Sequence, residues 1–224
     1  AVAEINENED VRAMVWTGAG RGFCSGADLS PSRRAAGDNS DSSLDKTFNA
    51  LMRDLYNLRV PTVAAVNGVT AGGGCALALV ADITLAARSV DFILLFTRQL
   101  GLIPDMGVTW FTPRLVGRGR AAGLAMLGER LAAKDAEDWG LIWKCVDDEA
   151  LMDEAMAIAE KFRDGPTLAF RHVRFALDAG LCNDFPSQLA YEAEVQEGVL
   201  QKSEDYPEGV KAFLEKRKPQ FKGR

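Results

Sequence analysis

A short buried strand, a run of glycines and an apolar helix follow one another in the middle of the chain, and this order constrains the fold most. Pro61–Val66 is apolar and β-prone and ends at Asn67-Gly68. Gly72-Gly73-Gly74 then leads into Cys75–Ala81, which has the composition of a buried helix, and Ile83–Ala87 is a further strand. Strand, glycine turn, helix and strand in this order predict an α/β fold with parallel pairing.

The segments before this unit predict another strand and a helix. Val11–Thr17 is a β-prone apolar run that ends at a glycine, and Gly18–Gly26 is a glycine-rich loop. The composition of Ser30–Ser43, rich in Ser, Arg, Gly, Asp and Asn, is typical of a loop. Apolar residues recur at helical spacing through Leu44–Leu58.

Helices dominate the second half of the chain. Pro104-Asp105 is expected to open a helix, because proline suits a first turn and aspartate can cap it. Further helices are expected at Ala121–Leu127, Ala132–Trp139, Glu149–Arg163, Thr167–Ala179, Gln188–Gln201 and Lys211–Lys218. We therefore expect a core over residues 1–146 and a helical region over residues 147–224. Because the chain starts at Ala1 without a methionine and soon enters a strand, we expect a segment to be missing before it.

Composition and charge narrow the functional classes. The 224 residues carry a formal net charge of -6, which argues against a nucleic-acid partner, since that would require a basic face. The four cysteines show no CxxC pairing, so we expect neither a metal cluster nor disulfides, and a cytoplasmic location. No apolar run reaches the length that spans a membrane, and no signal peptide is evident.

Three familiar site patterns fit poorly. Gly18–Gly22 follows a strand, but its third glycine comes one residue too early for a dinucleotide fingerprint. Ser25 lies among glycines without the G-x-S-x-G elbow of a serine nucleophile. His172 is the single histidine, so a Ser-His-Asp arrangement or a histidine-based metal site would depend on it alone, and a surface position on a helix is the simpler interpretation.

The triple glycine allows two interpretations. Glycine permits close backbone approach and positive φ, so Gly72-Gly73-Gly74 would suit tight packing of a strand on a helix. The first N–H groups of a helix also lack intrahelical partners, and such a turn would suit a developing oxyanion. Spacing alone favours neither interpretation.

Two longer stretches together resemble the crotonase (enoyl-CoA hydratase/isomerase) superfamily. Arg21–Leu29 (RGFCSGADL) is similar to the family's first oxyanion loop, and Val66–Asp82 (VNGVTAGGGCALALVAD) is similar to the second. Gly101–Gly107, Leu131–Val146 and the C-terminal FLEKRKPQF also look familial, so the resemblance covers essentially the whole chain. It implies that the backbone N–H groups of Ala27 and Gly73 hold a thioester oxygen.

The chain departs from the hydratases at two positions. Their glutamates correspond to Ala76 and Thr97 here, and neither side chain can serve as the acid or base that water addition needs. Asp105 remains, at the place where dienoyl-CoA isomerases and 1,2-epoxyphenylacetyl-CoA isomerases carry their acting aspartate. The stretch from Leu100 to Leu131 and the later WGLIWKCVDDE look most like the latter group. The competing interpretation of Asp105 is a helix cap, and one residue can do both.

The resemblance also implies an architecture, an assembly and a substrate. The expected fold is a spiral of ββα units with a helical C-terminal trimerisation region, assembled as a homotrimer or a hexamer made of two trimers. The expected partner is an acyl-CoA thioester, with no metal and no other cofactor. Residues implied to contact the substrate are Ser25, Gly26, Asp28, Leu29, Gly72 and Thr97. A solvated surface charge is the simpler interpretation of each candidate for the CoA phosphates, and these candidates are Arg21, Arg33, Arg34, Lys216, Arg217 and Lys218.

The function expected from these features is that of an acyl-CoA isomerase. It would act through a thioester enolate, shifting a double bond or converting 1,2-epoxyphenylacetyl-CoA to oxepin-CoA. Two alternatives stay open: a hydratase-like enzyme with an atypical base, and a non-catalytic member that only binds acyl-CoA. Ala76 and Thr97 favour the non-catalytic alternative, and Asp105 argues against it.

Overall fold

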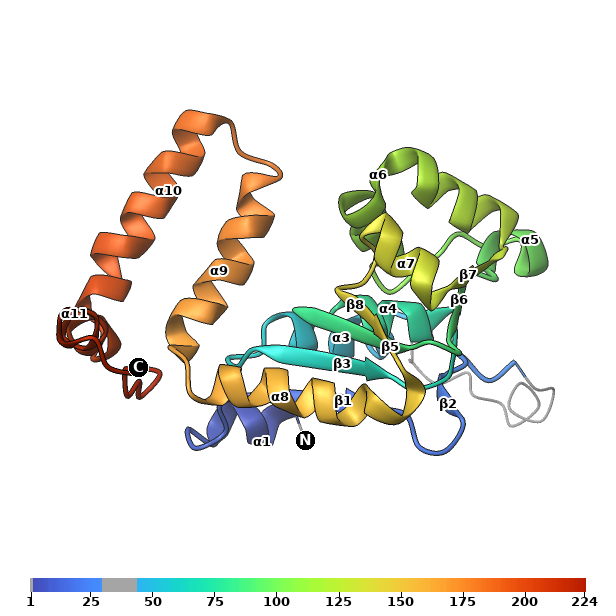
Figure 1. The fold of residues 1–224 in the computed structure, drawn as a ribbon. Coiled ribbons are helices and arrows are strands. Elements are labelled where there is room, and N and C mark those ends of the chain that lie inside the picture. Colours follow the sequence, from blue (N-terminus) through green and yellow to red (C-terminus); the bar gives the residue numbers. More distant parts are fainter. Residues whose placement is uncertain (1, 30–43) are drawn as a thin grey trace. The chain divides into compact units, whose positions relative to one another are not determined.

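A computed structural model of the protein describes residues 2–29 and 44–224 (Figure 1). The chain divides into two compact units. The first contains Ala1–Met14, Leu58–Thr62 and Ala157–Arg224, and the second contains Val15–Asn57 and Val63–Met156.

The described strands form two four-stranded sheets. One has the order β1 (Met14–Thr17), β3 (Thr62–Val66), β5 (Ile83–Ala87) and β8 (Lys144–Val146), and β5 is parallel to both of its neighbours. The other has the order β2 (Gly22–Cys24), β4 (Val69–Ala71), β6 (Asp91–Ile93) and β7 (Arg130–Ala132). β4 is parallel to both β2 and β6, and β7 is antiparallel to β6. Parallel pairing in both sheets confirms the predicted α/β class.

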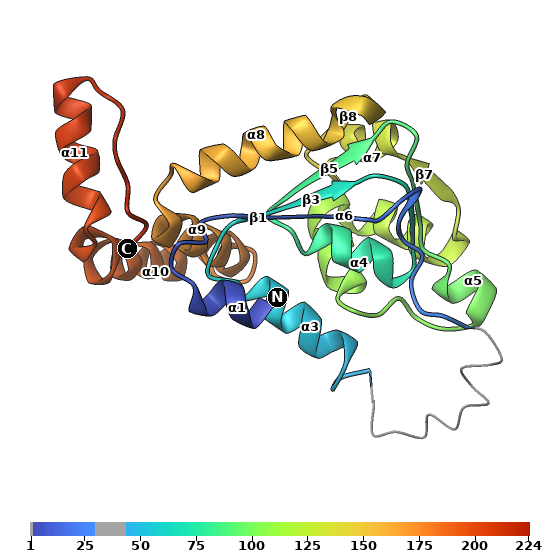
Figure 2. The ribbon, with the colours of Figure 1, turned by 90° about the horizontal axis from the view of Figure 1, so that it is seen from below.

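From β1 to β6, successive strands alternate between the two sheets. β3 lies in the first sheet, β4 in the second, and α4 (Gly73–Leu79) follows. The next strands repeat this order, since β5, β6 and α5 (Phe96–Leu100) follow one another in the same way. Figure 2 shows β3 and β5 as neighbouring arrows with α4 alongside. The repetition gives a spiral of ββα turns, as expected from the resemblance.

Burial explains why the central elements form where they do. All five residues of β3 are buried, which is typical of a parallel strand that is covered on both faces. α4 is buried along most of its length, and the Trp16 indole N–H donates to the carbonyl of Leu77 at 3.2 Å. Thr84 donates to the carbonyl of Ala78 at 2.6 Å. These bonds fix α4, and with it the glycine turn at its start, to the first sheet.

The other helices of this part of the chain are partly exposed. α3 (Phe48–Tyr56) buries Met52 and Leu55. α6 (Val108–Leu127) is kinked at Gly117, where the backbone has a φ of 77°. α7 (Ala133–Trp139) precedes β8, and α8 (Leu151–Arg163) follows a short helical turn at Asp148–Ala150. None of the described helices is long and apolar enough to cross a lipid bilayer.

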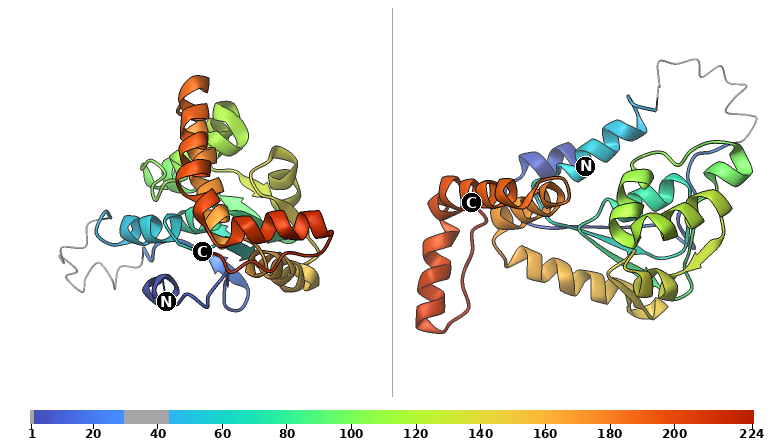
Figure 3. Two further views of the ribbon diagram at one scale, coloured as in Figure 1. Left: turned by 90° about the vertical axis from the view of Figure 1, so that its left-hand side faces the viewer. Right: turned by 90° about the horizontal axis from the view of Figure 1, so that it is seen from above.

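The first unit contains α1 (Val2–Glu7), α9 (Thr167–Gly180), α10 (Phe185–Gly198) and α11 (Asp205–Glu215). α9 and α10 lie side by side, and α11 runs across their end (Figures 1 and 3). Arg12 donates to the Thr167 hydroxyl at 2.6 Å and to the carbonyl of Phe221 at 3.3 Å. Arg174 donates to the carbonyls of Leu58 and Val60 at 2.8 and 3.1 Å. Arginine side chains thus join the sequence-distant segments of this unit.

Several elements differ from the sequence-based prediction. The predicted strand Val11–Thr17 begins only at Met14, and the Gly18–Gly26 loop contains strand β2. Pro104-Asp105 does not open a helix, because α6 begins at Val108. Two strands, β7 and β8, lie in the half of the chain that was expected to be helical. The predicted loop Ser30–Ser43 lies outside the described residues, and the boundary between residues 146 and 147 stays a prediction.

Candidate functional site

A largely apolar cavity of about 250 Å³ opens in the second unit, between the two glycine-rich segments and the helices that follow them. Ala27, Gly73 and Asp105, which the sequence predicts as the acting residues, all line it. The other described residues that line it are Cys24, Ser25, Gly26, Leu29, Leu44, Phe48, Leu51, Gly72, Leu77, Leu95, Phe96, Leu100, Leu102 and Met106. Residues from 24 to 106 along the sequence thus converge on one space.

The two glycine-rich segments meet backbone to backbone beside this cavity. A Cβ on Gly74 would collide with the carbonyl of Cys24, so only glycine allows this approach. Gly26 has a φ of 89°, and a Cβ built on it would lie 3.3 Å from the Gly73 nitrogen. The structure therefore places Ala27 and Gly73 on adjoining pieces of backbone. The packing interpretation of the triple glycine is right at Gly74, and it does not conflict with an oxyanion role for Gly73.

The N–H groups of Ala27 and Gly73 donate no hydrogen bond within residues 2–29 and 44–224. Gly73 is the first residue of α4, where an N–H has no partner inside the helix. Ala27 follows the left-handed Gly26 and belongs to no helix or strand. Two unused donors that border one cavity are the elements from which an oxyanion hole is built.

Asp105 supplies the only carboxylate among the described residues that line the cavity. Asp105 is partly buried, and this burial raises the pKa of its carboxyl above the ordinary value. A hydrogen bond from the backbone N–H of Asp105 lowers the pKa by a smaller amount. A carboxylate with a raised pKa binds a proton more readily, which suits it to accept and return a proton.

The competing interpretation of Asp105 as a helix cap is wrong. The cap position of α6 is Gly107, and no side chain caps that helix end. Asp105 contributes only its backbone carbonyl, which accepts from the Val108 N–H at 3.0 Å. Met106 and Gly107, with φ values of 53° and 88°, turn the chain between Asp105 and the helix. The sequence gives no signal for these two left-handed residues, and they are the reason that α6 begins later than predicted.

The remaining predicted contact residues divide into two groups. Ser25, Gly26, Leu29 and Gly72 line the cavity, whereas Asp28 and Thr97 are not among its described lining residues. Thr97 is exposed on α5. Ala76, the other position where hydratases carry a glutamate, is fully buried inside α4. Neither position thus places a polar side chain in this cavity.

The apolar wall of the cavity was not predicted. Phe48 and Leu51 come from α3, Leu77 from α4 and Phe96 from α5, and Met106, the residue after Asp105, also lines the cavity. The helical periodicity of Leu44–Leu58 includes the first two, but periodicity marks an apolar face without telling whether it faces a core or a ligand.

Cys75, His172 and the acidic groups of the described residues do not form a second candidate centre. Burial raises the pKa of the Cys75 thiol to about 12, and its sulfur lies against the carbonyls of Thr70 and Ile93, so it is an inert core residue. His172 lies on α9 and does not line the cavity. Within the part of the chain that the structure describes, no cluster of His, Cys, Asp and Glu could hold a metal ion.

The candidate phosphate-binding cations differ in their surroundings. Arg217 forms ion pairs with Glu208 at 2.7 Å and with Glu215 at 2.6 Å, and it holds the pKa of Glu208 down to about 2. Its charge is therefore already matched within the chain. Arg33 and Arg34 lie outside the described residues, and for Arg21, Lys216 and Lys218 a phosphate contact stays a prediction.

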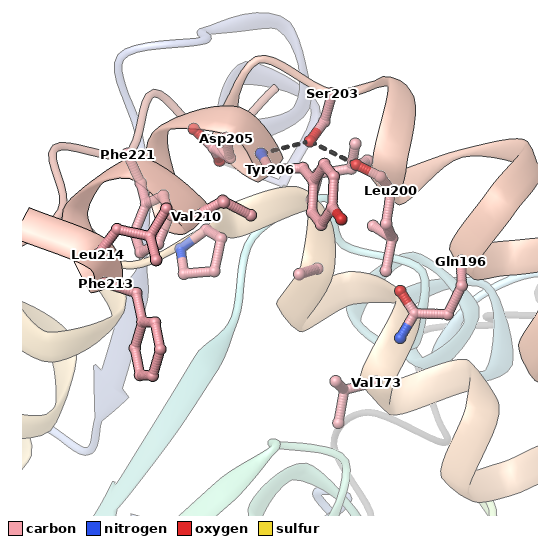
Figure 4. A pocket seen from close by; sticks show the side chains of 14 residues that line it. Val173, Gln196, Leu200, Ser203, Asp205, Tyr206, Val210, Phe213, Leu214 and Phe221 are labelled. Carbon is pink, nitrogen blue, oxygen red and sulfur yellow. Dashed lines mark hydrogen bonds between the residues drawn. The ribbon is translucent and has the colours of Figure 1, made fainter.

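A second apolar cavity, of about 550 Å³, lies within the first unit (Figure 4). Val173 of α9 and Val210, Phe213 and Leu214 of α11 line it, with the Gln196 amide beside them. Phe213 and Leu214 are 82% and 73% exposed. Its one described carboxylate, Asp205, accepts from the backbone N–H groups of Lys222 and Gly223 at 2.6 and 2.8 Å, so both of its oxygens already have partners within the chain.

Comparison with known proteins agrees with this geometry. The whole chain, residues 1–224, matches the family model described as Enoyl-CoA hydratase/isomerase. The chain is 43% identical over 224 residues to "1,2-epoxyphenylacetyl-CoA isomerase" of Escherichia coli (strain K12), covering 99% of this chain and 85% of that protein. It is also 46% identical over 215 residues to "Probable enoyl-CoA hydratase" of Rhodobacter capsulatus, covering 96% and 82%.

Solved structures give the same result. The crystal structure of enoyl-CoA hydratase from Bacillus anthracis superposes with a TM-score of 0.89 at 36% identity, covering 100% of this chain and 86% of that one. Enoyl-CoA hydratase subunit I from Geobacillus kaustophilus superposes with a TM-score of 0.87 at 35% identity, covering 100% and 85%. Two free backbone donors and a carboxylate border one cavity of this fold, as the described residues show. Together with the match over residues 1–224, this shows that the chain belongs to the enoyl-CoA hydratase/isomerase (crotonase) family.

Proposed function

We propose that the protein is an acyl-CoA isomerase in which Asp105 moves a proton along the acyl group of a CoA thioester. The observation that carries the proposal is the cavity with a single described carboxylate, bordered by the free N–H groups of Ala27 and Gly73. The thioester carbonyl oxygen would accept hydrogen bonds from these two N–H groups. Negative charge that develops on this oxygen would be stabilised there.

The chemistry follows from one base and one oxyanion hole. Asp105 would remove a proton from a carbon next to the double bond, and the electrons would move into the thioester as an enolate. The same carboxyl group would return the proton at a different carbon, so that the double bond shifts and no atom is gained or lost. One group suffices because the reaction returns the proton it takes, and the reaction as proposed needs no metal or redox cofactor.

The specific substrate is the finer part of the proposal. The similarity to the Escherichia coli protein supports 1,2-epoxyphenylacetyl-CoA, whose conversion to oxepin-CoA is also an isomerisation. The apolar cavity wall, with Phe48, Leu77 and Phe96, is compatible with an unsaturated ring. A double-bond shift in an enoyl-CoA uses the same groups and is the other form of this activity.

A hydratase is the second candidate, because the Rhodobacter capsulatus relative carries that name. Water addition needs an acid and a base around the water. With Ala76 buried in α4 and Thr97 exposed outside the cavity, Asp105 would have to serve alone. We therefore favour the isomerase.

One experiment separates these activities. The protein is incubated in heavy water with 3-enoyl-CoA, 2-enoyl-CoA and 1,2-epoxyphenylacetyl-CoA, and the products are identified by mass spectrometry. An isomerase gives products that differ from the substrate only by deuterium in place of hydrogen at the α or γ carbon. A hydratase adds the elements of heavy water to the 2-enoyl ester. A protein that binds all three esters and changes none would be the non-catalytic family member.

We also propose that the protein assembles with copies of itself, as a trimer or as two stacked trimers. The apolar cavity between α9 and α11 and the exposed side chains around it support this proposal (Figure 4). Leu177, Phe213 and Leu214 are each more than two-thirds exposed. Apolar patches of this kind on a folded chain mark contact surfaces.

A further inference from the structure

Met106 lies at the boundary between two cavities of the second unit. It lines the cavity of about 250 Å³ around Ala27, Gly73 and Asp105, which we call the catalytic cavity, and it also lines a neighbouring pocket of about 480 Å³. No other described residue lines both. The two spaces use different faces of α3, since Phe48 and Leu51 border the first, whereas Met52 and Tyr56 border the second.

The neighbouring pocket is walled by aromatic rings, and we call it the aromatic pocket. It is lined by Asn49, Met52, Arg53, Tyr56, Met106, Gly107, Trp110 and Phe111. Trp110 packs edge to face against Tyr56 at 6.0 Å and against Phe111 at 5.0 Å between ring centroids. Arg114 covers the Trp110 ring at 4.0 Å. Rings held in this way form a fixed apolar wall that hydrocarbon can contact.

The Met106 side chain is held against the oxyanion segment. A Cβ built on Gly73 would lie 2.6 Å from the Met106 sulfur, and Met106 is only 7% exposed. Its φ of 53° is unfavourable for a residue with a side chain. Such backbone strain persists only where the surrounding structure enforces it, and it concentrates at functional sites.

We infer that Met106 determines substrate specificity by closing the catalytic cavity against the aromatic pocket. This inference rests on the proposed function, because it takes the acyl group to lie between Gly73 and Asp105. With the thioether in place, the site accepts short or compact acyl groups, including small rings. Without it, the aromatic pocket becomes an extension of the acyl site, and longer hydrocarbon chains fit.

The first test is Met106→Ala, which removes the thioether but keeps a Cβ and therefore the same backbone strain. Turnover is measured along a series of 3-enoyl-CoA esters from four to twelve carbons. Each methylene newly buried in the aromatic pocket should favour binding about fourfold. We expect the kcat/KM ratio of the longest to the shortest ester to rise at least tenfold over that of the unmodified protein. Met106→Gly, which relieves the strain at positive φ, serves if the alanine variant does not fold.

Trp110→Leu provides the second test, because Trp110 lies in the aromatic pocket and not in the catalytic cavity. In a protein that keeps Met106, Trp110→Leu should leave the preference for acyl-chain length unchanged. In the Met106→Ala protein, Trp110→Leu should alter this preference, because the acyl chain then reaches the position of the Trp110 ring. Met126→Ala is the matched control for Met106→Ala, because Met126 is a 65% exposed methionine on α6, the helix that carries Trp110.

Binding measurements keep this inference separate from the proposed function. Dissociation constants of saturated acyl-CoA esters, measured by calorimetry, should show the same shift in chain-length preference without any reaction. If no ester is turned over but Met106→Ala shifts these constants, the isomerase proposal fails and the role of Met106 stands. If folded Met106→Ala and Met106→Gly leave both the turnover ratio and the binding series unchanged, Met106 does not separate the two spaces and the inference is overturned.

Discussion

The side-chain amide of Asn67 forms a two-way hydrogen-bond pair with the backbone of Gly18. Its oxygen accepts from the Gly18 N–H at 3.0 Å, and its nitrogen donates to the carbonyl of Gly18 at 3.0 Å and to that of Gly20 at 3.0 Å. Asn67 directly follows β3, and Gly18 directly follows β1. One side chain therefore joins the segments that lead to the two proposed oxyanion donors, Ala27 and Gly73.

Replacing Asn67 by aspartate should lower turnover by misaligning these donors. A carboxylate can still accept from the Gly18 N–H, but it cannot donate to the carbonyls of Gly18 and Gly20. We expect kcat to fall about tenfold, equivalent to about 1.4 kcal/mol, with a smaller change in KM. Steady-state kinetics check this, with Asn57→Asp as the control, because the Asn57 amide also donates to a carbonyl, at the exposed end of α3. An equal loss in both variants would make Asn67 a purely structural residue.

Asp105→Asn should abolish most of the turnover and leave the fold intact. The amide has nearly the same size, and α6 does not depend on this side chain for its cap. Loss of a positioned acid–base group typically costs about 10²–10⁴-fold, so we expect a decrease in kcat of that order. Deuterium exchange at the α and γ carbons should disappear, while CoA-ester affinity changes little. Near-normal turnover and exchange would mean that the base lies elsewhere.

The raised pKa of Asp105 should appear in both activity and stability. Because the ionised form accepts the proton, kcat/KM should fall on the acid side, with its inflection above the ordinary aspartate value. A carboxyl whose pKa is higher in the folded than in the unfolded protein stabilises the fold below its unfolded pKa. That contribution is lost as the pH rises through the folded pKa.

Asp105→Asn should therefore raise the melting temperature more at pH 8 than at pH 4. Thermal unfolding followed by circular dichroism checks this, with exposed Asp54→Asn as the control for a changed net charge. An effect of Asp105→Asn that is the same at both pH values would contradict the desolvation of this carboxyl.

A pair of substitutions at Gly73 isolates the contribution of its N–H group. Gly73→Ala and Gly73→Pro both place a Cβ near the Met106 sulfur, but only proline removes the donor. Proline is tolerated at the first position of a helix, which is where Gly73 lies. Losing one oxyanion donor costs about 2.7–4 kcal/mol, so the proline variant should have a kcat about 10²–10³-fold below that of the alanine variant. Equal kcat values in two folded variants would remove the Gly73 donor from the mechanism.

The sequence predicts the longer elements and the glycine segments, because their signals are local. β3, β5 and α4 follow from buried apolar runs bounded by glycine and asparagine. β2 and β4 are three residues long, too short to show a period, so the sequence predicts a loop at β2 and no element at β4. The late start of α6 depends on the left-handed backbone at Met106, which a proline and an aspartate just before it do not indicate.

The candidate site is predictable only through the family resemblance. Spacing alone left Gly73 undecided and favoured a helix cap for Asp105, and it is the structure that brings both residues to one cavity. The apolar wall could not be predicted, because Phe48 and Met106 come from separate segments whose faces meet only in the folded chain. Likewise, no local signal shows that Met106 borders two spaces.

Disrupting the apolar surface of the first unit should break the proposed assembly while each chain stays folded. Phe213 and Leu214 are among the most exposed large apolar residues described, and both line the cavity beside α11. Because Phe213 and Leu214 are 82% and 73% exposed, a glutamate at either position removes little burial within its own chain. Each chain should therefore stay folded, and the melting temperature should lose mainly its dependence on protein concentration. We expect Phe213→Glu and Leu214→Glu to shift the sedimentation coefficient from that of a trimer or hexamer toward that of a monomer.

The matched control is Met126→Glu on α6, another exposed apolar residue that lies outside this cavity. It should leave the sedimentation coefficient unchanged, because its side chain belongs to the second unit and not to the surface around α11. Sedimentation velocity at several micromolar concentrations measures all three variants beside the unmodified protein. If the unmodified protein sediments as a monomer throughout, the assembly proposal is wrong. If it is a trimer that both Phe213→Glu and Leu214→Glu leave intact, the chains meet through a different surface.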